Sequence, residues 1–155
     1  MRIALLAVGK LGRATEAELA RDYIQRAAAA GRGFGITGVE LIEVEARKPG
    51  KAAEAEVLLG QLAPGDHLIA CDEHGTARAS RAFADHLGRL RDQGARRVVF
   101  AVGGADGLGE AVRERADETL AFGPQTWPHA LVRAMLAEQV YRAVTIWAGS
   151  PYHRD

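Results

Sequence analysis

Residues that cross-link a chain are nearly absent from this sequence. Cys71 is the only cysteine among 155 residues, so the chain forms no internal disulfide and has no cysteine-built metal site. This scarcity fits a reducing, cytoplasmic setting. His67, His74 and His86 show no metal-ligand spacing with one another, so the sequence predicts no metal site.

An excess of one charge and long apolar runs are also lacking. Twenty Lys and Arg balance twenty Asp and Glu, so composition gives no indication of a nucleic-acid partner, and no DNA partner is expected. The apolar run at residues 3–8 is too short for a signal-peptide core or a membrane span. We therefore expect no membrane association and interpret this run as a buried strand.

The sequence does contain a regular alternation of strand-like and helix-like stretches. The predicted strands are residues 3–8, 39–44, 67–71 and 97–102, with 120–122 as a candidate fifth, and the predicted helices are 15–31, 52–62, 80–93, 108–118 and 130–147. Thr15 and Glu18 predict a capping box at the start of the first helix. Strands separated by helices predict one α/β domain over residues 1–155, with a mostly parallel sheet and helices on both faces.

Ligands of such sheets bind beyond the carboxyl ends of the strands, which selects three segments. They are Cys71–Gly75, Gly103–Gly109 and the loop that follows residues 120–122. The Gly103–Gly104 pair allows close approach of a ligand to the backbone, but the segment lacks the ending of a P-loop and the spacing of a dinucleotide fingerprint. A ligand-binding loop and a plain tight turn both remain open. Cys71 closes an apolar strand, so its thiol is expected to be inert.

Trp127-Pro128-His129 comes just before the last predicted helix. Proline fixes its own φ and pushes the preceding residue toward an extended conformation. A rigid extended segment exposes backbone groups that are suited to reading the edge of an adenine. The plainer interpretation is a turn at the start of the helix, with Trp127 packed in the core.

The last predicted helix is apolar over much of its surface, which indicates burial both against its own sheet and against a partner. Its stripe consists of Leu136, Val140, Ala143, Val144 and Trp147. Arg133, Glu138 and Arg142 are polar exceptions, and such residues usually form solvated salt bridges. The tail Tyr152-His153-Arg154 offers groups that stack on bases and pair with phosphate, although its position favours a frayed end.

Together these segments resemble a known family. Pro128-His129-Ala130-Leu131-Val132-Arg133, Glu138-Gln139-Val140-Tyr141-Arg142-Ala143 and Pro151-Tyr152-His153-Arg154 are similar to the C-terminal signature of the RlmH family, large-subunit ribosomal RNA pseudouridine N3-methyltransferases of the SPOUT superfamily. Ala7-Val8-Gly9-Lys10 and the run from Gly103 to Leu108 match as well. The resemblance therefore covers essentially the whole chain.

The resemblance implies a deep trefoil knot in the C-terminal half, an exception to the rule against threaded loops. It also implies that S-adenosyl-L-methionine is bound by three loops in that knot. Carried over to this sequence, the candidate cofactor-binding residues are Cys71, Asp72, Gly103, Gly104, Gly123, Pro124, Gln125, Thr126, Trp127 and Pro128. The family has serine-rich sequence where this chain has Gly123-Pro124-Gln125, so backbone contacts are what the resemblance implies there.

The family acts as a homodimer on the 23S rRNA of the assembled ribosome, with the last helix in the interface and the partner's tail completing the site. Methyl transfer to N3 of pseudouridine requires loss of a proton. His153 is the first candidate to handle that proton because imidazole titrates near neutrality, and Glu138 is the second. Arg142 and Arg154, with Tyr152 beside them, are expected to anchor phosphate or stabilise negative charge on the base.

Two other functions compete with this interpretation. One is a different nucleotide-dependent enzyme, such as an NAD-dependent reductase, which should carry a dinucleotide fingerprint and a ribose-binding acid about twenty residues further on. The other is a non-catalytic ribosome-binding or RNA-binding module that keeps the α/β fold without a cofactor. Binding of S-adenosyl-L-methionine distinguishes this module from a methyltransferase.

Overall fold

A computed structural model describes all residues, 1–155. Its centre is a five-stranded sheet in the order β2-β1-β4-β3-β5 in which every pairing is parallel. The strands are β1 (Arg2–Val8), β2 (Gly38–Val44), β3 (His67–Ala77), β4 (Arg97–Val102) and β5 (Glu118–Ala121). The predicted parallel α/β sheet is therefore confirmed, and the candidate strand near residue 120 is the edge strand β5.

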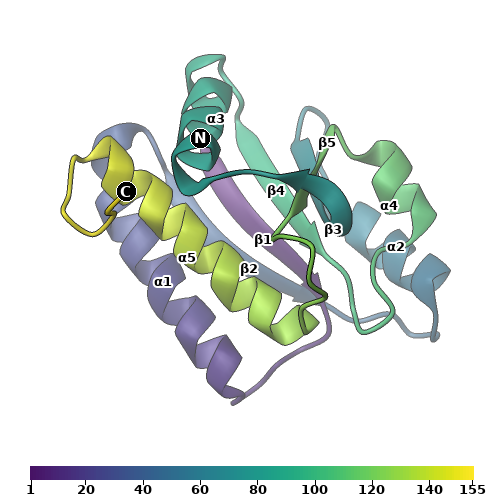
Figure 1. Cartoon of the computed structure of the whole chain (residues 1–155). Coiled ribbons are helices and arrows are strands. Elements are labelled where there is room, and N and C mark those ends of the chain that lie inside the picture. Colours follow the sequence, from purple (N-terminus) through teal and green to yellow (C-terminus); the bar gives the residue numbers. More distant parts are fainter.

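Helices cover both faces of the sheet, as predicted (Figure 1). The helices are α1 (Thr15–Gly31), the 3-10 helix η1 (Arg32–Phe34), α2 (Lys51–Leu59), α3 (Ser80–Asp92), α4 (Glu110–Arg115) and α5 (His129–Trp147). Figure 1 shows α1, α3 and α5 on one face and α2 and α4 on the other. No helix combines the length and the hydropathy required to cross a bilayer.

Burial on both faces explains why the central strands are continuous apolar runs. Successive side chains of a strand point to opposite faces, so Ile3 and Leu5 of β1 enter the core under α1, α3 and α5. Ala4 and Leu6 enter the second core, under α2 and α4. All four side chains are at most 1% exposed. Such double burial is typical of the inner strands of a parallel sheet.

Several predicted boundaries were wrong. Thr15 is not the N-cap of α1, because it is already the first helical residue. The N-cap residue is Ala14, and no side chain forms a capping hydrogen bond there. Helix α4 ends at Arg115, well before the predicted end at residue 118, because Glu118 opens β5. Helix α2 ends at Leu59, and the loop predicted after α1 contains the 3-10 turn η1.

The largest departure is the length of β3, which the sequence predicted to end at Cys71. The strand continues to Ala77, with a bulge in its pairing with β5 between Cys71 and Thr76. Both of these residues pair with Leu120. A Cβ added at Gly75 would lie 2.8 Å from the backbone carbon of Leu120, so only glycine lets the bulged chain pass this close to β5.

Candidate active site

A cavity of about 590 Å³ opens at the carboxyl ends of β3, β4 and β5, where parallel sheets bind their ligands. Such a volume lies within the range of pockets that hold small molecules. Nine of the ten candidate cofactor-binding residues line it. They are Cys71, Asp72, Gly103, Gly104, Gly123, Gln125, Thr126, Trp127 and Pro128, and Pro124 alone does not reach the cavity. The structure thus brings the three predicted loops together.

The loop after β4 is a tight turn that also lines the cavity. The backbone N–H of Gly107 donates to the Gly104 carbonyl at 3.0 Å. A Cβ added at Gly103 would lie 2.5 Å from the carbonyl carbon of Gly107 and 2.7 Å from the Leu108 nitrogen. Real Cβ atoms essentially never approach backbone this closely, so the turn requires glycine at position 103. The tight turn is therefore confirmed, while ligand binding by this loop stays a prediction.

The bulged segment of β3 that follows Cys71 supplies a carboxylate to the cavity wall. Asp72 Oδ1 accepts the His74 backbone N–H at 2.9 Å, and Oδ2 accepts Arg113 Nε at 2.5 Å. Burial opposes ionisation, but these two donors hold the pKa of Asp72 below its ordinary value. Burial, followed by the neighbouring Asp72 charge, raises the pKa of Cys71 to about 12. Asp72 is therefore a fixed negative charge, and Cys71 is not a nucleophile at neutral pH.

The loop after β5 closes the third side. Thr126 Oγ1 donates to Glu73 Oε2 at 3.1 Å, which ties this loop to the bulged segment of β3. Trp127 Nε1 donates to the Phe122 carbonyl at 3.1 Å, and the side chain is 38% exposed. The interpretation of Trp127 as a core residue was therefore wrong. Its indole is fixed at the rim of the cavity, against the extended segment that leads into α5.

The candidate catalytic residues form a second group at the far end of α5. Glu138 Oε1 accepts three hydrogen bonds, from Arg142 Nη2 at 2.5 Å, from Arg142 Nε at 3.0 Å and from the Tyr152 hydroxyl at 2.9 Å. Arg142 Nη1 lies 3.2 Å from His153 Nδ1. Burial, with hydrogen bonds to Tyr23 and Glu138, raises the pKa of Tyr152. We call Glu138, Arg142, Tyr152 and His153 the tail cluster.

The tail cluster shows that the end of the chain is folded back rather than frayed, so that expectation was wrong. The Tyr152 ring packs edge-on against Tyr141, with 4.8 Å between centroids. Asp155 ends the tail in an ion pair with Arg81 of α3, at 2.5 Å. Of the candidate catalytic residues only Arg154 is exposed. These contacts fix the tail without using any residue of the cavity.

The tail cluster and the cavity are separate within one chain, because no tail-cluster residue lines the cavity. Val132, in the first turn of α5, is the last residue of the chain that does so. A helix rises about 1.5 Å per residue, which places Glu138 about 9 Å further along the axis. The structure gathers candidate cofactor-binding residues around the cavity and candidate catalytic residues in the tail cluster. Within one chain it does not bring these two groups together.

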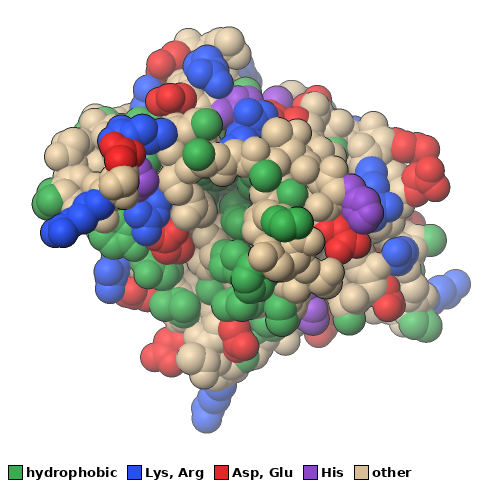
Figure 2. Space-filling view, viewed as in Figure 1, with side chains coloured by type: hydrophobic (Ala, Val, Ile, Leu, Met, Phe, Trp, Pro, Cys, Tyr) green, Lys and Arg blue, Asp and Glu red, His purple; other side chains and the backbone are tan.

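Beside α5 lies a second hollow, which is mostly apolar. It has a volume of about 630 Å³. Figure 2 shows hydrophobic side chains gathered around a hollow in the middle of this face. Its lining includes Leu19, Tyr23, Phe83, Leu131, Met135 and Glu138. Leu19 is 44% exposed although it belongs to this apolar surface. The hollow lies between the cavity and the tail cluster. Phe122 lines both the hollow and the cavity, and Glu138 of the tail cluster lines the hollow.

Arg133 is the residue that sequence reasoning misjudged most. It was expected in a solvated salt bridge, yet its side chain is 0% exposed. Its guanidinium donates to the carbonyls of Val8 and Gly9 and to Glu43 Oε2. The only feature of the sequence that singled out Arg133 was its place in the Pro128–Arg133 segment, which resembles the C-terminal signature of the family. Arg133 thereby fixes the start of α5, beside the cavity, to the end of β1.

The fold and the cavity together define an α/β chain with a small-molecule site at the carboxyl edge of its sheet. Residues 1–153 match the family described as "Predicted SPOUT methyltransferase", and the chain belongs to this family. It is 70% identical to the ribosomal RNA large subunit methyltransferase H of Caulobacter sp. (strain K31) over 155 residues, which is 100% of both chains. With the protein of that name from Phenylobacterium zucineum (strain HLK1) it shares 64% identity over 100% of both.

A solved structure supports the fold independently. The probable methyltransferase from Bordetella pertussis Tohama I superposes with a TM-score of 0.51 and 20% identity, over 92% of this chain and 95% of that one. At this identity the likeness concerns the arrangement of helices and strands alone. It agrees with the five-stranded parallel sheet described above.

Proposed function

We propose that this chain is a cytoplasmic enzyme that transfers the methyl group of S-adenosyl-L-methionine to N3 of a pseudouridine in 23S rRNA of the assembled ribosome. Residues 1–155 form one SPOUT methyltransferase domain in this proposal. The observation that carries it is the meeting of three loops around one cavity in a chain of this family. The 70% identity to a ribosomal RNA large subunit methyltransferase supports the choice of RNA as substrate.

The residues of the cavity fit such a cofactor. Apolar side chains, among them Val102, Leu120 and Phe122, offer a dry wall for an adenine, and the loop after β4 presents bare backbone because Gly103 and Gly104 lack side chains. Asp72 and its ion-pair partner Arg113 both line the cavity, so this wall offers polar groups without a net charge. When bound, the cofactor supplies an electrophilic methyl group. The protein's task is to hold it in line with the attacking nitrogen.

The knot belongs to the same proposal. The loops at Gly103–Leu108 and Gly123–Pro128 line one cavity, although α4 and β5 separate them in sequence. The chain must pass from the edge strand β5 back across the sheet to reach α5, which packs with α1 and α3 (Figure 1). A passage of the last segment through the loop after β4 produces the deep trefoil knot that the family resemblance implies.

The separation of the tail cluster from the cavity is the reason to propose a homodimer. A tail that cannot reach its own cavity is suited to reach the cavity of a partner, if two copies pair across α5. The second hollow, with Leu19, Leu131 and Met135 in its lining, provides an apolar surface next to α5 for that contact. In the pair, His153 and Arg142 of each chain face the cofactor cavity of the other.

His153 is the proposed handler of the N3 proton. Its Nδ1 lies 3.2 Å from the donor Arg142 Nη1, and its Nε2 faces Asp155 Oδ1 at 3.1 Å, so Nδ1 accepts and Nε2 donates in this arrangement. The Nδ1 lone pair becomes available when Arg142 turns to a phosphate or to the substrate base. Glu138, with three donors on Oε1, is better suited to hold Arg142 and Tyr152 in place.

The decisive test is transfer of a labelled methyl group, measured in parallel on intact ribosomes, free large subunits and naked 23S rRNA. We expect methylation of one pseudouridine on intact ribosomes and far less on naked rRNA, because a chain of zero net charge brings little electrostatic affinity for RNA. No transfer to any of the three, together with no calorimetric binding of S-adenosyl-L-methionine, would make the chain a non-catalytic module instead.

The homodimer is tested by mixing two inactive variants, Gly103→Ala with a damaged cavity and His153→Ala with a damaged tail. Random exchange of subunits makes half of the dimers mixed, and each mixed dimer carries one intact site, so about a quarter of the wild-type activity should return. No recovery after verified exchange would mean that each chain completes its own site.

A further inference from the structure

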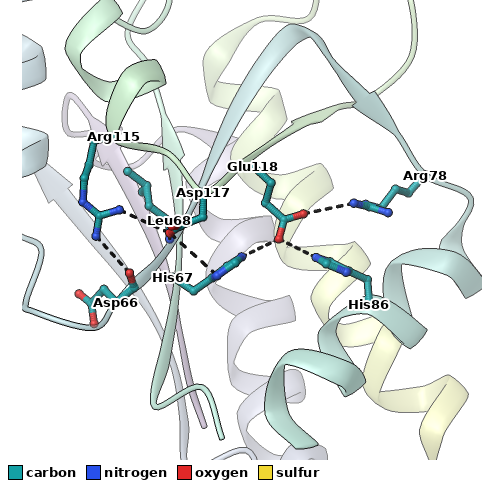
Figure 3. Close-up of polar contacts among 8 residues, drawn as sticks. All are labelled: Asp66, His67, Leu68, Arg78, His86, Arg115, Asp117 and Glu118. Atoms are coloured by element: carbon teal, nitrogen blue, oxygen red, sulfur yellow. Dashed lines mark hydrogen bonds and ion pairs between the residues drawn. The ribbon is translucent and has the colours of Figure 1, made fainter. Parts of the chain in front are cut away.

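We propose that His67, His86 and Glu118 form a binding site for a zinc ion, separate from the methyltransferase cavity. The three side chains come from the first residue of β3, the middle of α3 and the first residue of β5. Figure 3 shows them pointing toward one another. One ring nitrogen of each histidine and one oxygen of the carboxylate lie within 4.8 Å of one another.

The two imidazoles converge on a single oxygen atom. His67 Nε2 lies 2.5 Å and His86 Nε2 lies 2.7 Å from Glu118 Oε1. Two nitrogens and a carboxylate oxygen are a ligand set that zinc uses, with a water in the fourth position of a tetrahedron. Bonds of about 2.1 Å place such ligand atoms about 3.4 Å apart. Since Oε1 now lies 2.5 Å and 2.7 Å from the two nitrogens, zinc binding requires these separations to increase by about 0.7–0.9 Å.

The surroundings hold the ligands in the orientation that a metal needs. Arg78 Nη2 lies 3.2 Å from Glu118 Oε2, so the second carboxylate oxygen is occupied and Oε1 is left to face the histidines. Asp117 Oδ2 lies 3.9 Å from His67 Nδ1 and is itself fixed by the Leu68 backbone N–H at 2.8 Å. A carboxylate behind a metal-bound imidazole is the usual outer partner at zinc sites.

Protonation of the two histidines suits a cation. In the free protein both Nε2 atoms donate to Oε1. When zinc binds, each neutral ring carries its proton on Nδ1 and offers the Nε2 lone pair, and for His67 this turns the proton toward Asp117.

The site is open to solvent yet remote from the cavity. The side chains of His67, His86 and Glu118 are 25%, 17% and 18% exposed, so an ion and its water can enter. His67 starts β3, and Cys71, further along the same strand, lines the cavity. Zinc would connect the edge strand β5, which has a single neighbouring strand, to α3. Sequence spacing could not reveal it, because His86 and Glu118 are 32 residues apart.

The test is titration of zinc chloride into the metal-stripped full-length protein, followed by calorimetry and by thermal unfolding. We expect one zinc per chain and, at a zinc concentration a hundredfold above Kd, a rise in Tm of about 5–10 °C. His86→Gln and Glu118→Gln should each weaken binding by at least about tenfold. His74→Ala, which removes an exposed histidine outside the cluster, should bind zinc as the wild type does.

Cobalt(II) provides a second measurement that does not depend on the variants folding. Bound to the wild-type protein, it should give the intense visible absorption of a tetrahedral site, and zinc should displace it. The proposal is overturned if the wild type binds no zinc, if both Gln variants bind it unchanged, or if cobalt gives only the weak spectrum of an octahedral ion.

Discussion

Arg133 and Glu43 form an ion pair of 2.9 Å between Nη1 and Oε2, in which the arginine side chain is 0% exposed and the glutamate 17%. Glu43 Oε2 also accepts the Leu11 backbone N–H at 2.8 Å. The pair therefore joins α5, β2 and the loop after β1 at one point. Burial lowers the pKa of Arg133, while the Glu43 charge and hydrogen bond act against this shift.

Removal of the arginine should be costly for this reason. Arg133→Ala removes the guanidinium donor from the carbonyls of Val8 and Gly9 and leaves Glu43 with the Leu11 N–H alone. Loss of one partner from a buried pair typically costs about 3–5 kcal/mol. Urea unfolding of the variant should show this decrease in the free energy of unfolding. The matched control is Arg26→Ala, which breaks an exposed ion pair with Asp22 and should cost less than about 1 kcal/mol. Equal losses in the two variants would contradict this account.

Gly103→Ala should weaken cofactor binding without unfolding the protein. The added Cβ meets the backbone of Gly107 and Leu108 at 2.5 to 2.7 Å, so the loop after β4 must move away from the position in which it lines the cavity. We expect the Kd for S-adenosyl-L-methionine to rise at least about tenfold, or about 1.4 kcal/mol. Gly33→Ala, where nothing lies within 4 Å of the new Cβ, should bind normally. Unchanged calorimetric affinity of Gly103→Ala would argue against this loop as part of the site.

His153→Ala should slow methyl transfer about 10²- to 10⁴-fold in single-turnover experiments, as expected for a lost proton acceptor. Glu138→Gln is the informative comparison, because it keeps the shape of the side chain but removes the charge that holds Arg142. A full rate for His153→Ala at all pH values would remove this residue from the chemistry, and a loss in Glu138→Gln alone would transfer the role to Glu138.

Cys71 should be a slow target for alkylation although it lines an open cavity. The thiolate is the reactive form, and a pKa of about 12 keeps it scarce in the folded protein. Because this pKa is raised, reactivity with iodoacetamide should be minimal at pH 8 and increase only as the pH approaches 12. In urea the thiol should react at the rate of an ordinary cysteine. Rapid modification of the native protein at pH 8 would show that the thiol is not desolvated.

Much of the fold was predictable because its determinants are local. Ile3–Val8 and Val98–Val102 are apolar without interruption, as strands buried on both faces must be. The extension of β3 was not predictable, since Asp72–Ala77 is polar and is a strand only because β5 lies beside it. Propensity alone cannot reveal pairing with a strand more than forty residues away.

The candidate site was predictable to a similar extent. One topological rule, that ligands bind at the carboxyl ends of parallel strands, selected the loops that the structure gathers around the cavity. This rule could not predict the contacts that tertiary packing creates. Arg133 reads as a surface residue until β1 and β2 are placed around it, and His67, His86 and Glu118 show no motif because three separate elements bring them together.

The strand order also determines when this protein can become complete during its synthesis. The inner strand β1 is made first, yet one of its two neighbours is β4, and the arginine that closes over its end, Arg133, lies 124 residues after Gly9. A nascent chain therefore carries an unfinished sheet until almost its last helix has emerged, and such long-range pairings form slowly. An enzyme proposed to act on finished ribosomes thus cannot assemble its own site before α5 has been synthesised.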